Sequence, residues 1–251
     1  MGARIGIDVG GTFTDFILTR DDAPPLLHKV LSTPGDPSIA VVTGLAELAA
    51  MVDQGRGVES FVASIETIVH GTTVATNATL TGTGAKSALL TTEGIRDALE
   101  MRRGIREEQY NNAYTNVKPL VPRYLRAGVK GRLDRAGREI APLDLAGIDA
   151  AIAEFRREGV EAVSICFMNS YANPAHEAAA AERVRAAMPD AFLTVSSTLL
   201  PSIRFYARVS TTALNSYVGP ELNRYAEQLV SRLASAGFRG TLLIMQSNGG
   251  V

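Results

Sequence analysis

The pattern of apolar and polar positions predicts that the chain opens with three strands. Arg4–Val9 is apolar and rich in β-forming residues, and Phe13–Thr19 follows it after a Gly-Gly turn. A third such stretch, Leu26–Leu31, follows the Pro24-Pro25 break. Short runs of this kind, separated by glycine and proline, are typical of strands joined by tight turns. The first 32 residues therefore predict a β-meander.

Strands and helices alternate through the rest of the chain. Further strands are predicted at Glu66–His70, Lys86–Thr91, Ala162–Phe167, Phe192–Val195 and Thr241–Met245. Helices are predicted from Asp36 or Ser38 to about Asp53, from Gly71 to about Leu80, and at Glu93–Arg102, Asp144–Glu158, Pro174–Met188 and Phe205–Ala236, the last interrupted or bent at Gly219-Pro220. Residues 104–137 show no clear helical or strand periodicity, although some β content is predicted there. This alternation after a meander predicts an α/β fold with a mixed sheet.

The composition is that of an ordinary globular protein, and it excludes several classes of function. Apolar residues make up 46% of the 251 residues and charged residues 20%, with basic and acidic residues interspersed. The net charge of -1 leaves no basic face for nucleic acid. No window approaches the ~18 consecutive apolar residues of a membrane span, and the N-terminus lacks the pattern of a signal peptide. We therefore expect a soluble, cytoplasmic protein without a nucleic-acid or membrane partner.

Three residues with reactive side chains are predicted to be structural. Cys166, the one cysteine, lies in an apolar run and has neither a helix N-terminus nor a cationic neighbour in the sequence, so we expect a buried strand residue. A single thiol excludes an internal disulfide and fits a reducing compartment. His28 lies in an early strand, and His176 lies at a helix start of surface type.

The strongest chemical signal is the segment from Asp8 to Asp15. A strand ends at Asp8, the two glycines Gly10 and Gly11 make a tight turn, and the returning strand carries threonine hydroxyls. Glycines let the backbone approach anionic oxygens and direct N–H groups at them. A carboxylate at the strand end can hold a hydrated Mg²⁺. This pattern predicts a phosphate loop, and it is neither a Walker loop nor a dinucleotide fingerprint, because a strand follows the glycines.

A second candidate segment begins at His70, which is predicted to lie at a strand end. Gly71, Thr72 and Thr73 follow at a predicted helix start, and a helix N-terminus attracts a carboxylate, carbonyl or phosphate group. His70 could donate to a substrate carbonyl or move a proton near neutral pH. The alternative is that Thr72 is only a helix cap and His70 a hydrogen-bonded core residue.

Two further segments remain open between a functional and a structural interpretation. Arg102 and Arg103 could anchor an anionic group of a substrate by bidentate contact, or could form a solvated helix end. Gln246–Gly250 leaves the last predicted strand and could approach a nucleotide or substrate, or could be a turn.

The segment Asp8–Asp15 resembles the first phosphate loop of the superfamily that contains actin, hexokinase-type sugar kinases and the heat-shock chaperone ATPases. In the form Asp-Val-Gly-Gly-Thr-Phe-Thr-Asp it is similar to the loop of the hydantoinase A/5-oxoprolinase family. Further blocks in the family's order are found at Thr67–Ala78, Leu99–Gly104, Ser196–Pro201, Arg208–Pro220 and Gln246–Gly250. The chain departs from the family at one position. The usual Tyr-Glu-Arg of the family appears here as Tyr206-Ala207-Arg208, so any role of that glutamate is absent.

The resemblance implies a ribonuclease H-like mixed sheet with flanking helices, the N-terminal half of an actin-like ATPase architecture. Residues 1–110 would form an ATPase-like domain with the phosphate loop, residues 111–140 an irregular excursion, and residues 141–251 the continuation of that domain and the start of the hydantoinase A domain. The superfamily clamps ATP between two halves. One loop of this type occurs in the 251 residues, so we expect the chain to supply at most half of the ATP site.

The resemblance also implies a function, the ATP-dependent opening of a cyclic amide such as a hydantoin or 5-oxoproline, with ATP and Mg²⁺ as cofactors. Asp8 and His70 would be catalytic, and Asp8 would hold Mg²⁺ through water. The phosphate-binding residues would be Gly10, Gly11, Thr12, Thr14 and Asp15, and the substrate-binding residues Thr72, Thr73, Asn77, Arg103 and Asn248. The partner would be a hydantoinase B-type subunit, and we expect an oligomer.

Two other functions stay open at this point. The same family contains subunits of ATP-dependent acetone and acetophenone carboxylases, which use ATP on a ketone. In a different class, the 251 residues could act as a binding module without catalysis.

Overall fold

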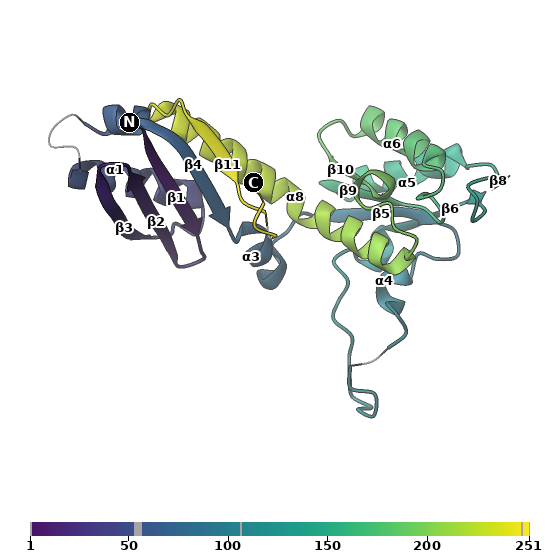
Figure 1. The fold of residues 1–251 in the computed structure, drawn as a ribbon. Coiled ribbons are helices and arrows are strands. Elements are labelled where there is room, and N and C mark those ends of the chain that lie inside the picture. Colours follow the sequence, from purple (N-terminus) through teal and green to yellow (C-terminus); the bar gives the residue numbers. More distant parts are fainter. Residues whose placement is uncertain (1, 53–56, 106, 247, 251) are drawn as a thin grey trace. The chain divides into compact units, whose positions relative to one another are not determined.

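The computed structural model describes residues 2–52, 57–105, 107–246 and 248–250. They divide into two compact units (Figure 1). The first unit consists of residues 1–82 and 221–251, and the second consists of residues 83–220. The expected excursion at residues 111–140 belongs to the second unit, and the units divide at residues 82/83 and 220/221.

The first unit contains a mixed five-stranded sheet in the order β11-β4-β1-β2-β3. Its strands are β1 (Ala3–Val9), β2 (Phe13–Arg20), β3 (Ala23–Leu31), β4 (Ile65–Thr72) and β11 (Thr241–Ile244). β1, β2 and β3 pair in antiparallel fashion, which confirms the predicted meander. β4 pairs with β1 in parallel fashion, and β11 pairs with β4 in the same way.

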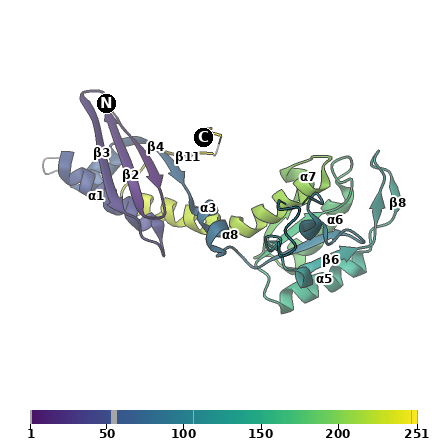
Figure 2. The same cartoon turned by 90° about the horizontal axis from the view of Figure 1, so that it is seen from below.

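Helices cover one face of this sheet. They are α1 (Pro37–Val52), α2 (Val58–Ala63) and the last part of α8 (Phe205–Ser235), and α1 is seen across the strands in Figure 2. The inward residues of β1, among them Ile5 and Ile7, pack with Leu45 of α1 and Leu229 of α8. The alternate residues of β1 point to the other face, because successive strand side chains point to opposite sides. That second face carries the candidate site.

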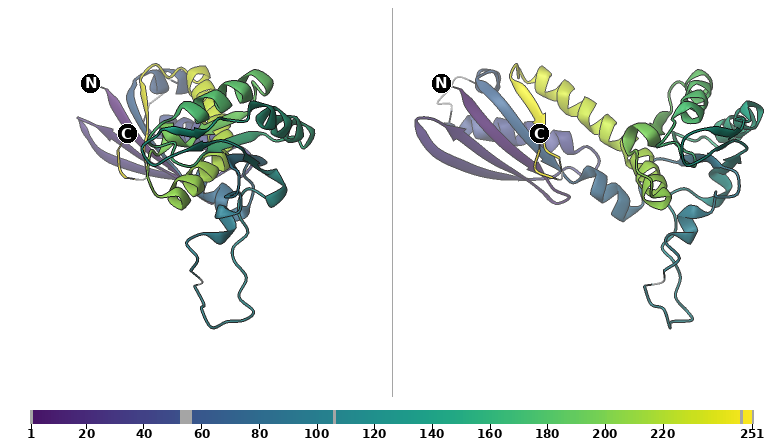
Figure 3. Two further views of the ribbon diagram at one scale, coloured as in Figure 1. Left: turned by 90° about the vertical axis from the view of Figure 1, so that its right-hand side faces the viewer. Right: turned by 45° about the vertical axis from the view of Figure 1, so that its right-hand side comes forward.

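The second unit is built on a parallel four-stranded sheet in the order β10-β9-β5-β6. Its strands are β5 (Ser87–Thr92), β6 (Arg126–Val129), β9 (Ala162–Cys166) and β10 (Phe192–Val195), and β7 (Arg132–Leu133) pairs with β8 (Glu139–Ala141). The helices are α4 (Ala98–Met101), η1 (Arg123–Leu125), α5 (Leu145–Arg157), α6 (Ala175–Ala187), α7 (Ser196–Leu199) and the first part of α8. Residues 107–121 form a long excursion without strand or helix, visible in Figure 3. Every residue of β5 and β9 is buried, as expected for central strands of a parallel sheet.

The structure corrects four expectations. The expected mixed sheet is present in the first unit, but a separate parallel sheet forms the second unit instead of extending it. The helix predicted at Glu93–Arg102 is reduced to α4, because Gly94 has a φ of 88°, outside the helical region. The helix α8 runs through Pro220 without the interruption that was one of the two expectations there, although proline removes one backbone donor. His176 is buried rather than at the surface, and its Nε2 lies 2.7 Å from Glu139 Oε2.

Two other expectations are confirmed. Cys166 is a free, fully buried residue of β9, and burial raises the pKa of its thiol to about 11, which keeps it protonated at neutral pH. His28 lies in β3 with its Nε2 2.7 Å from Glu47 Oε2.

No helix within the described ranges combines the length and apolar character needed to cross a membrane.

Candidate functional site

The Gly-Gly turn between β1 and β2 exposes backbone donors. The N–H of Gly10 donates to the carbonyl of Phe13 at 3.0 Å, so this donor is used inside the hairpin. The N–H groups of Gly11 and Thr12 donate to no acceptor among the described residues, and both residues are exposed. Neither glycine has a positive φ. The glycines therefore provide room above the turn rather than an unusual backbone conformation.

Thr14 supports this turn from beneath. It is fully buried, and its hydroxyl lies 2.9 Å from the hydroxyl of Ser32. Ser32 in turn donates to the carbonyl of Gly10 at 2.8 Å. Because the Ser32 hydrogen is used in that bond, Thr14 is the donor to Ser32. Thr14 was expected to bind phosphate, but its hydroxyl instead fixes the backbone of the turn. No local pattern in the sequence points to Ser32, because it lies 22 positions from Gly10.

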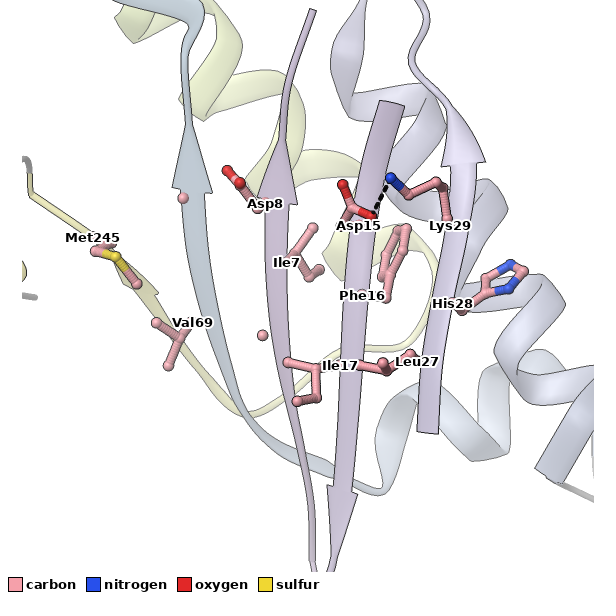
Figure 4. A pocket seen from close by; sticks show the side chains of 12 residues that line it. Ile7, Asp8, Asp15, Phe16, Ile17, Leu27, His28, Lys29, Val69 and Met245 are labelled. Carbon is pink, nitrogen blue, oxygen red and sulfur yellow. Dashed lines mark ion pairs between the residues drawn. The ribbon is translucent and has the colours of Figure 1, made fainter. Parts of the chain in front are cut away.

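Asp8 presents a free carboxylate on the uncovered face of the sheet. The strand register aligns Gly71, Asp8, Asp15 and Lys29 in one row across β4, β1, β2 and β3. Lys29 Nζ lies 2.8 Å from Asp15 Oδ1 (Figure 4), so Asp15, expected at the phosphates, is already paired. Asp8 forms no hydrogen bond or ion pair with any described residue. A Cβ on Gly71 would lie 3.3 Å from Asp8 Oδ1, so the glycine keeps this carboxylate accessible.

The donor set around Asp8 fits Mg²⁺ held through water. The described ranges contain no group of three or more His, Cys, Asp or Glu side chains placed to hold a metal ion. Mg²⁺ commonly keeps several waters and binds through one or two carboxylates together with substrate phosphates, rather than in a protein cage. A single exposed carboxylate beside free backbone N–H groups matches that mode of binding.

An open pocket of about 700 Å³ continues from Asp8 along the same face of the sheet. Figure 4 shows Asp8, Asp15 and Lys29 near one end and aliphatic side chains beyond them. Beyond the row of Gly71, Asp8, Asp15 and Lys29, the outward-facing residues that line it are Gly6, Ile17, Leu27, Val69 and Met245. The pocket therefore combines an apolar floor with charged groups at one end.

The segment after β4 lies against the Gly-Gly turn. The N–H and the hydroxyl of Thr73 both point to the carbonyl of Val9, at 3.1 and 3.3 Å. In α3 (Val74–Thr81), Asn77 Nδ2 donates to Thr73 Oγ1 at 3.2 Å, and a Cβ on Gly11 would lie 3.4 Å from that same nitrogen. The predicted phosphate loop and the predicted substrate segment are thus neighbours in the structure.

His70 differs from its expected position. β4 continues to Thr72, so His70 is not at the strand end, and it is fully buried on the covered face. Its Nε2 lies 2.7 Å from the hydroxyl of Tyr225 in α8, while its Nδ1 has no partner among the described residues. Burial lowers the pKa of His70 to about 4, so the ring is neutral at physiological pH. No local sequence pattern links His70 to Tyr225, which lies 155 positions away.

Arg103 and Asn248, the other two residues expected to bind substrate, are described by fewer contacts. Arg103 is exposed in the second unit, next to Arg102, whose guanidinium pairs with Glu107. The side-chain oxygen of Asn248 accepts from the N–H of Gly250 at 2.9 Å, so the segment after β11 forms a local turn.

Comparisons with known families cover nearly the whole chain. The model of the hydantoinase/oxoprolinase N-terminal region matches residues 4–188. The model described as hydantoinase/oxoprolinase matches residues 208–251.

Two curated relatives and two solved structures agree with this match. Caprolactamase subunit alpha of Pseudomonas jessenii is 43% identical over 250 residues, which is 99% of this chain and 36% of that protein. Acetophenone carboxylase gamma subunit of Aromatoleum aromaticum is 32% identical, over 98% of this chain and 35% of that protein. The crystal structure of the ATP-dependent caprolactamase from Pseudomonas jessenii has a TM-score of 0.91 over 98% of this chain and 36% of that one. A nucleotide-free acetone carboxylase structure, 24% identical, has a TM-score of 0.83 over 96% of this chain and 36% of that one, and it supports the fold alone. The chain thus spans about a third of the length of these relatives.

Proposed function

We propose that this chain, which belongs to the hydantoinase/oxoprolinase family, supplies a triphosphate-binding face to an ATP-dependent enzyme that opens cyclic amides. Two observations carry the proposal. The unpaired carboxylate of Asp8 and the unused N–H groups of Gly11 and Thr12 lie around one turn, and 43% identity links the chain to a caprolactamase subunit.

Each group has a distinct role in this proposal. The N–H groups of Gly11 and Thr12, with the Thr12 hydroxyl, bind phosphate oxygens as preorganised donors. Asp8 holds Mg²⁺ through water, and the ion neutralises charge on the triphosphate. Gly10 and Thr14 act indirectly by fixing the turn, and Asp15 acts through its pair with Lys29.

The substrate side of the site is proposed at the junction of β4 and α3. Thr72, Thr73 and Asn77 offer hydroxyl and amide groups next to the turn. ATP would activate the ring amide by phosphorylating its oxygen, which removes amide resonance and exposes the carbonyl carbon to water. Arg103 and Asn248 remain proposed as further substrate contacts.

We further propose that the first unit has the ribonuclease H-like topology of the actin-like ATPases. The supporting features are the antiparallel order β3-β2-β1, the two parallel strands β4 and β11 added beside β1, and the phosphate turn between β1 and β2. In open sheets of this kind, ligands bind outside the carboxyl ends of parallel strands. Val9 and Thr72 are the last residues of two such strands.

An assembly with a second type of subunit is also proposed. The names of the two curated relatives, subunit alpha and gamma subunit, describe chains that work with others. A hydantoinase B-type subunit would be the partner here.

A second candidate function is that of an ATP-dependent ketone carboxylase subunit. The 32% identity to acetophenone carboxylase gamma subunit favours it. Both reactions use ATP to activate a carbonyl oxygen, so the phosphate turn serves either one.

The two candidates separate in one assay on the complete enzyme. ATP hydrolysis is measured with caprolactam, hydantoin or 5-oxoproline, and in parallel with acetone or acetophenone plus bicarbonate. We expect ATP hydrolysis coupled to a ring-opened acid. Bicarbonate-dependent consumption of the ketone, with no lactam opening, would favour the carboxylase instead, and the absence of both would contradict an ATP-using role.

A further inference from the structure

Ser32 holds the Gly-Gly turn through two separate hydrogen bonds. It directly follows the last residue of β3 and is half-buried. Its hydroxyl donates to the carbonyl of Gly10 at 2.8 Å, and its backbone N–H donates to the carbonyl of Thr12 at 2.9 Å. The hydroxyl of Thr14, fully buried beneath the turn, donates to Ser32 Oγ at 2.9 Å. The Ser32 hydroxyl therefore has a fixed direction, with an acceptor for its hydrogen and a donor to its oxygen.

The bond to Gly10 also sets the direction of one of the free donors of the turn. The carbonyl of Gly10 and the N–H of Gly11 belong to the same peptide unit, which is planar and trans, so the two groups point in opposite directions. Because the carbonyl is turned toward Ser32, the N–H of Gly11 points away from Ser32. Gly11 is exposed, and its N–H donates to no acceptor among the described residues. Ser32 thus directs this donor from the opposite side of the peptide.

The two glycines make a flip of this peptide inexpensive. A peptide flip changes only ψ of Gly10 and φ of Gly11, and it exchanges the positions of the carbonyl and the N–H. The φ of Gly11 is not positive in the structure and would become positive in the flipped form, a region that glycine enters at little cost. The flipped peptide would present a carbonyl oxygen, instead of an N–H donor, to a bound phosphate. Such a peptide would repel the negative charge that the turn is proposed to bind.

We propose that Ser32 is a positioning residue of the turn, and that its hydroxyl prevents the Gly10–Gly11 peptide from flipping its N–H away from the bound phosphate. The identity of that ligand, a triphosphate, rests on the proposed function, whereas the direction of the peptide does not. The second bond, from the backbone N–H of Ser32 to Thr12, does not depend on the side chain. A substitution of Ser32 therefore removes the hydroxyl and leaves the backbone of residue 32 beside the turn.

The direction of the peptide is tested by crystal structures of the complete enzyme without nucleotide. In the unmodified enzyme the carbonyl of Gly10 should point to Ser32, and in Ser32→Ala the flipped peptide should be present in most molecules. In the double variant Ser32→Ala with Gly11→Ala the original direction should return, because a Cβ makes a positive φ unfavourable. A Gly10 carbonyl that keeps its direction in Ser32→Ala would overturn the proposal.

The consequence for binding is tested by calorimetry of the complete enzyme with Mg²⁺-ATP. Ser32→Ala should lower the ATP affinity about tenfold, because the apparent affinity falls with the fraction of molecules in the binding-competent form. Ser32→Thr, which keeps a hydroxyl, should recover affinity relative to Ser32→Ala.

The same substitution is then compared in two proteins that both carry alanine at residue 11. A Cβ there would lie 3.4 Å from Asn77 Nδ2, and both proteins share this contact. The loss caused by Ser32→Ala should shrink to less than about threefold, because alanine at residue 11 already disfavours the flipped peptide. An equal loss with glycine and with alanine at residue 11 would overturn the proposal, since a general loss of packing would not depend on that residue.

The control is Ser64→Ala, which removes another serine hydroxyl of the first unit. Ser64 Oγ also donates to a backbone carbonyl, that of Phe61, at 2.6 Å. This variant should change neither the Gly10–Gly11 peptide nor the ATP affinity, and a loss of affinity equal to that of Ser32→Ala would contradict a specific role for Ser32. If the unmodified enzyme binds no ATP, the proposed function fails, while the crystal structures still decide whether Ser32 directs the peptide.

Discussion

Asp8 and His70 lie on opposite faces of the same sheet. β1 and β4 are parallel neighbours, with Ile7 opposite His70 and Asp8 opposite Gly71. His70 therefore shares the covered face with Ile7, and Asp8 shares the open face with Gly71. The two residues expected to act together on one substrate cannot reach it from the same side. His70 can influence the site only through its neighbours, and Asp8 remains the directly accessible group.

We expect Asp8→Asn to abolish ATP-dependent turnover without unfolding the protein. The change removes the charge that would hold Mg²⁺, and turnover should fall by about a hundredfold or more, as when a group that stabilises transition-state charge is lost. Because Asp8 is exposed and unpaired, the free energy of unfolding should change by less than about 0.5 kcal/mol. Steady-state ATP hydrolysis and urea unfolding measure the two effects.

The matched control for this variant is Asp22→Asn. Asp22 is an exposed aspartate in the turn between β2 and β3. Near-normal turnover in Asp8→Asn, or equal losses in both variants, would rule out a role for Asp8 in holding the metal.

Gly11→Val should weaken nucleotide binding. A Cβ at this position would already lie 3.4 Å from Asn77 Nδ2, and the branched side chain would cover the free N–H groups of the turn. Calorimetry should show at least a tenfold loss of ATP affinity, about 1.4 kcal/mol. Gly35→Val is the control, because a Cβ there meets nothing within 4 Å. Equal ATP affinity in both variants would mean that the turn is only a hairpin connection.

His70 should make stability depend on pH below neutrality. Its folded pKa of about 4 lies below the ordinary value of 6.5 because the ring is buried. Between these two values the unfolded chain binds a proton that the folded ring does not, so the free energy of unfolding falls as the pH falls. The loss attributable to this residue should be about 2 to 3 kcal/mol between pH 7.5 and 4.5.

Urea unfolding of the wild type and of His70→Gln at both pH values isolates this effect, because His28 and His176 are common to both proteins. The wild type should lose more stability on acidification than the variant does. Equal losses in the two proteins would show that burial of His70 does not control its protonation.

Glu177 should be essential for the stability of the second unit. It is fully buried, and its carboxylate accepts from the N–H of Phe167 at 2.8 Å, the hydroxyl of Ser196 at 2.6 Å and the N–H of Ser197 at 2.8 Å. Glu177→Ala takes the carboxylate acceptor away from these three donors, which should cost on the order of 3 kcal/mol or more. Denaturant unfolding tests this against Glu182→Ala, an exposed glutamate of the same helix. Similar midpoints for the two variants would contradict the assignment.

The local features of the site can be predicted from the sequence. The runs of β-forming residues located β1, β2 and β3, and two glycines after Asp8 located the turn. These features follow from neighbouring residues, because turn geometry depends on the local chain. The family could be identified in the same way, because the order of its motifs is a property of the sequence alone.

Which groups can act at the site depends on the tertiary structure. Side chains alternate along β4, so the sequence predicts that His70 and Ile68 share one face of the strand. That this face is buried follows only from the pairing of β4 with β1 and its packing against α8. Tyr225, 155 positions away, could not be assigned to His70 from any local pattern. The burial of Thr14 against Ser32 likewise depends on how β3 pairs with β2. Strand register and helix packing join residues far apart in sequence, and those contacts separate the exposed donors of the site from the groups that hold them in place.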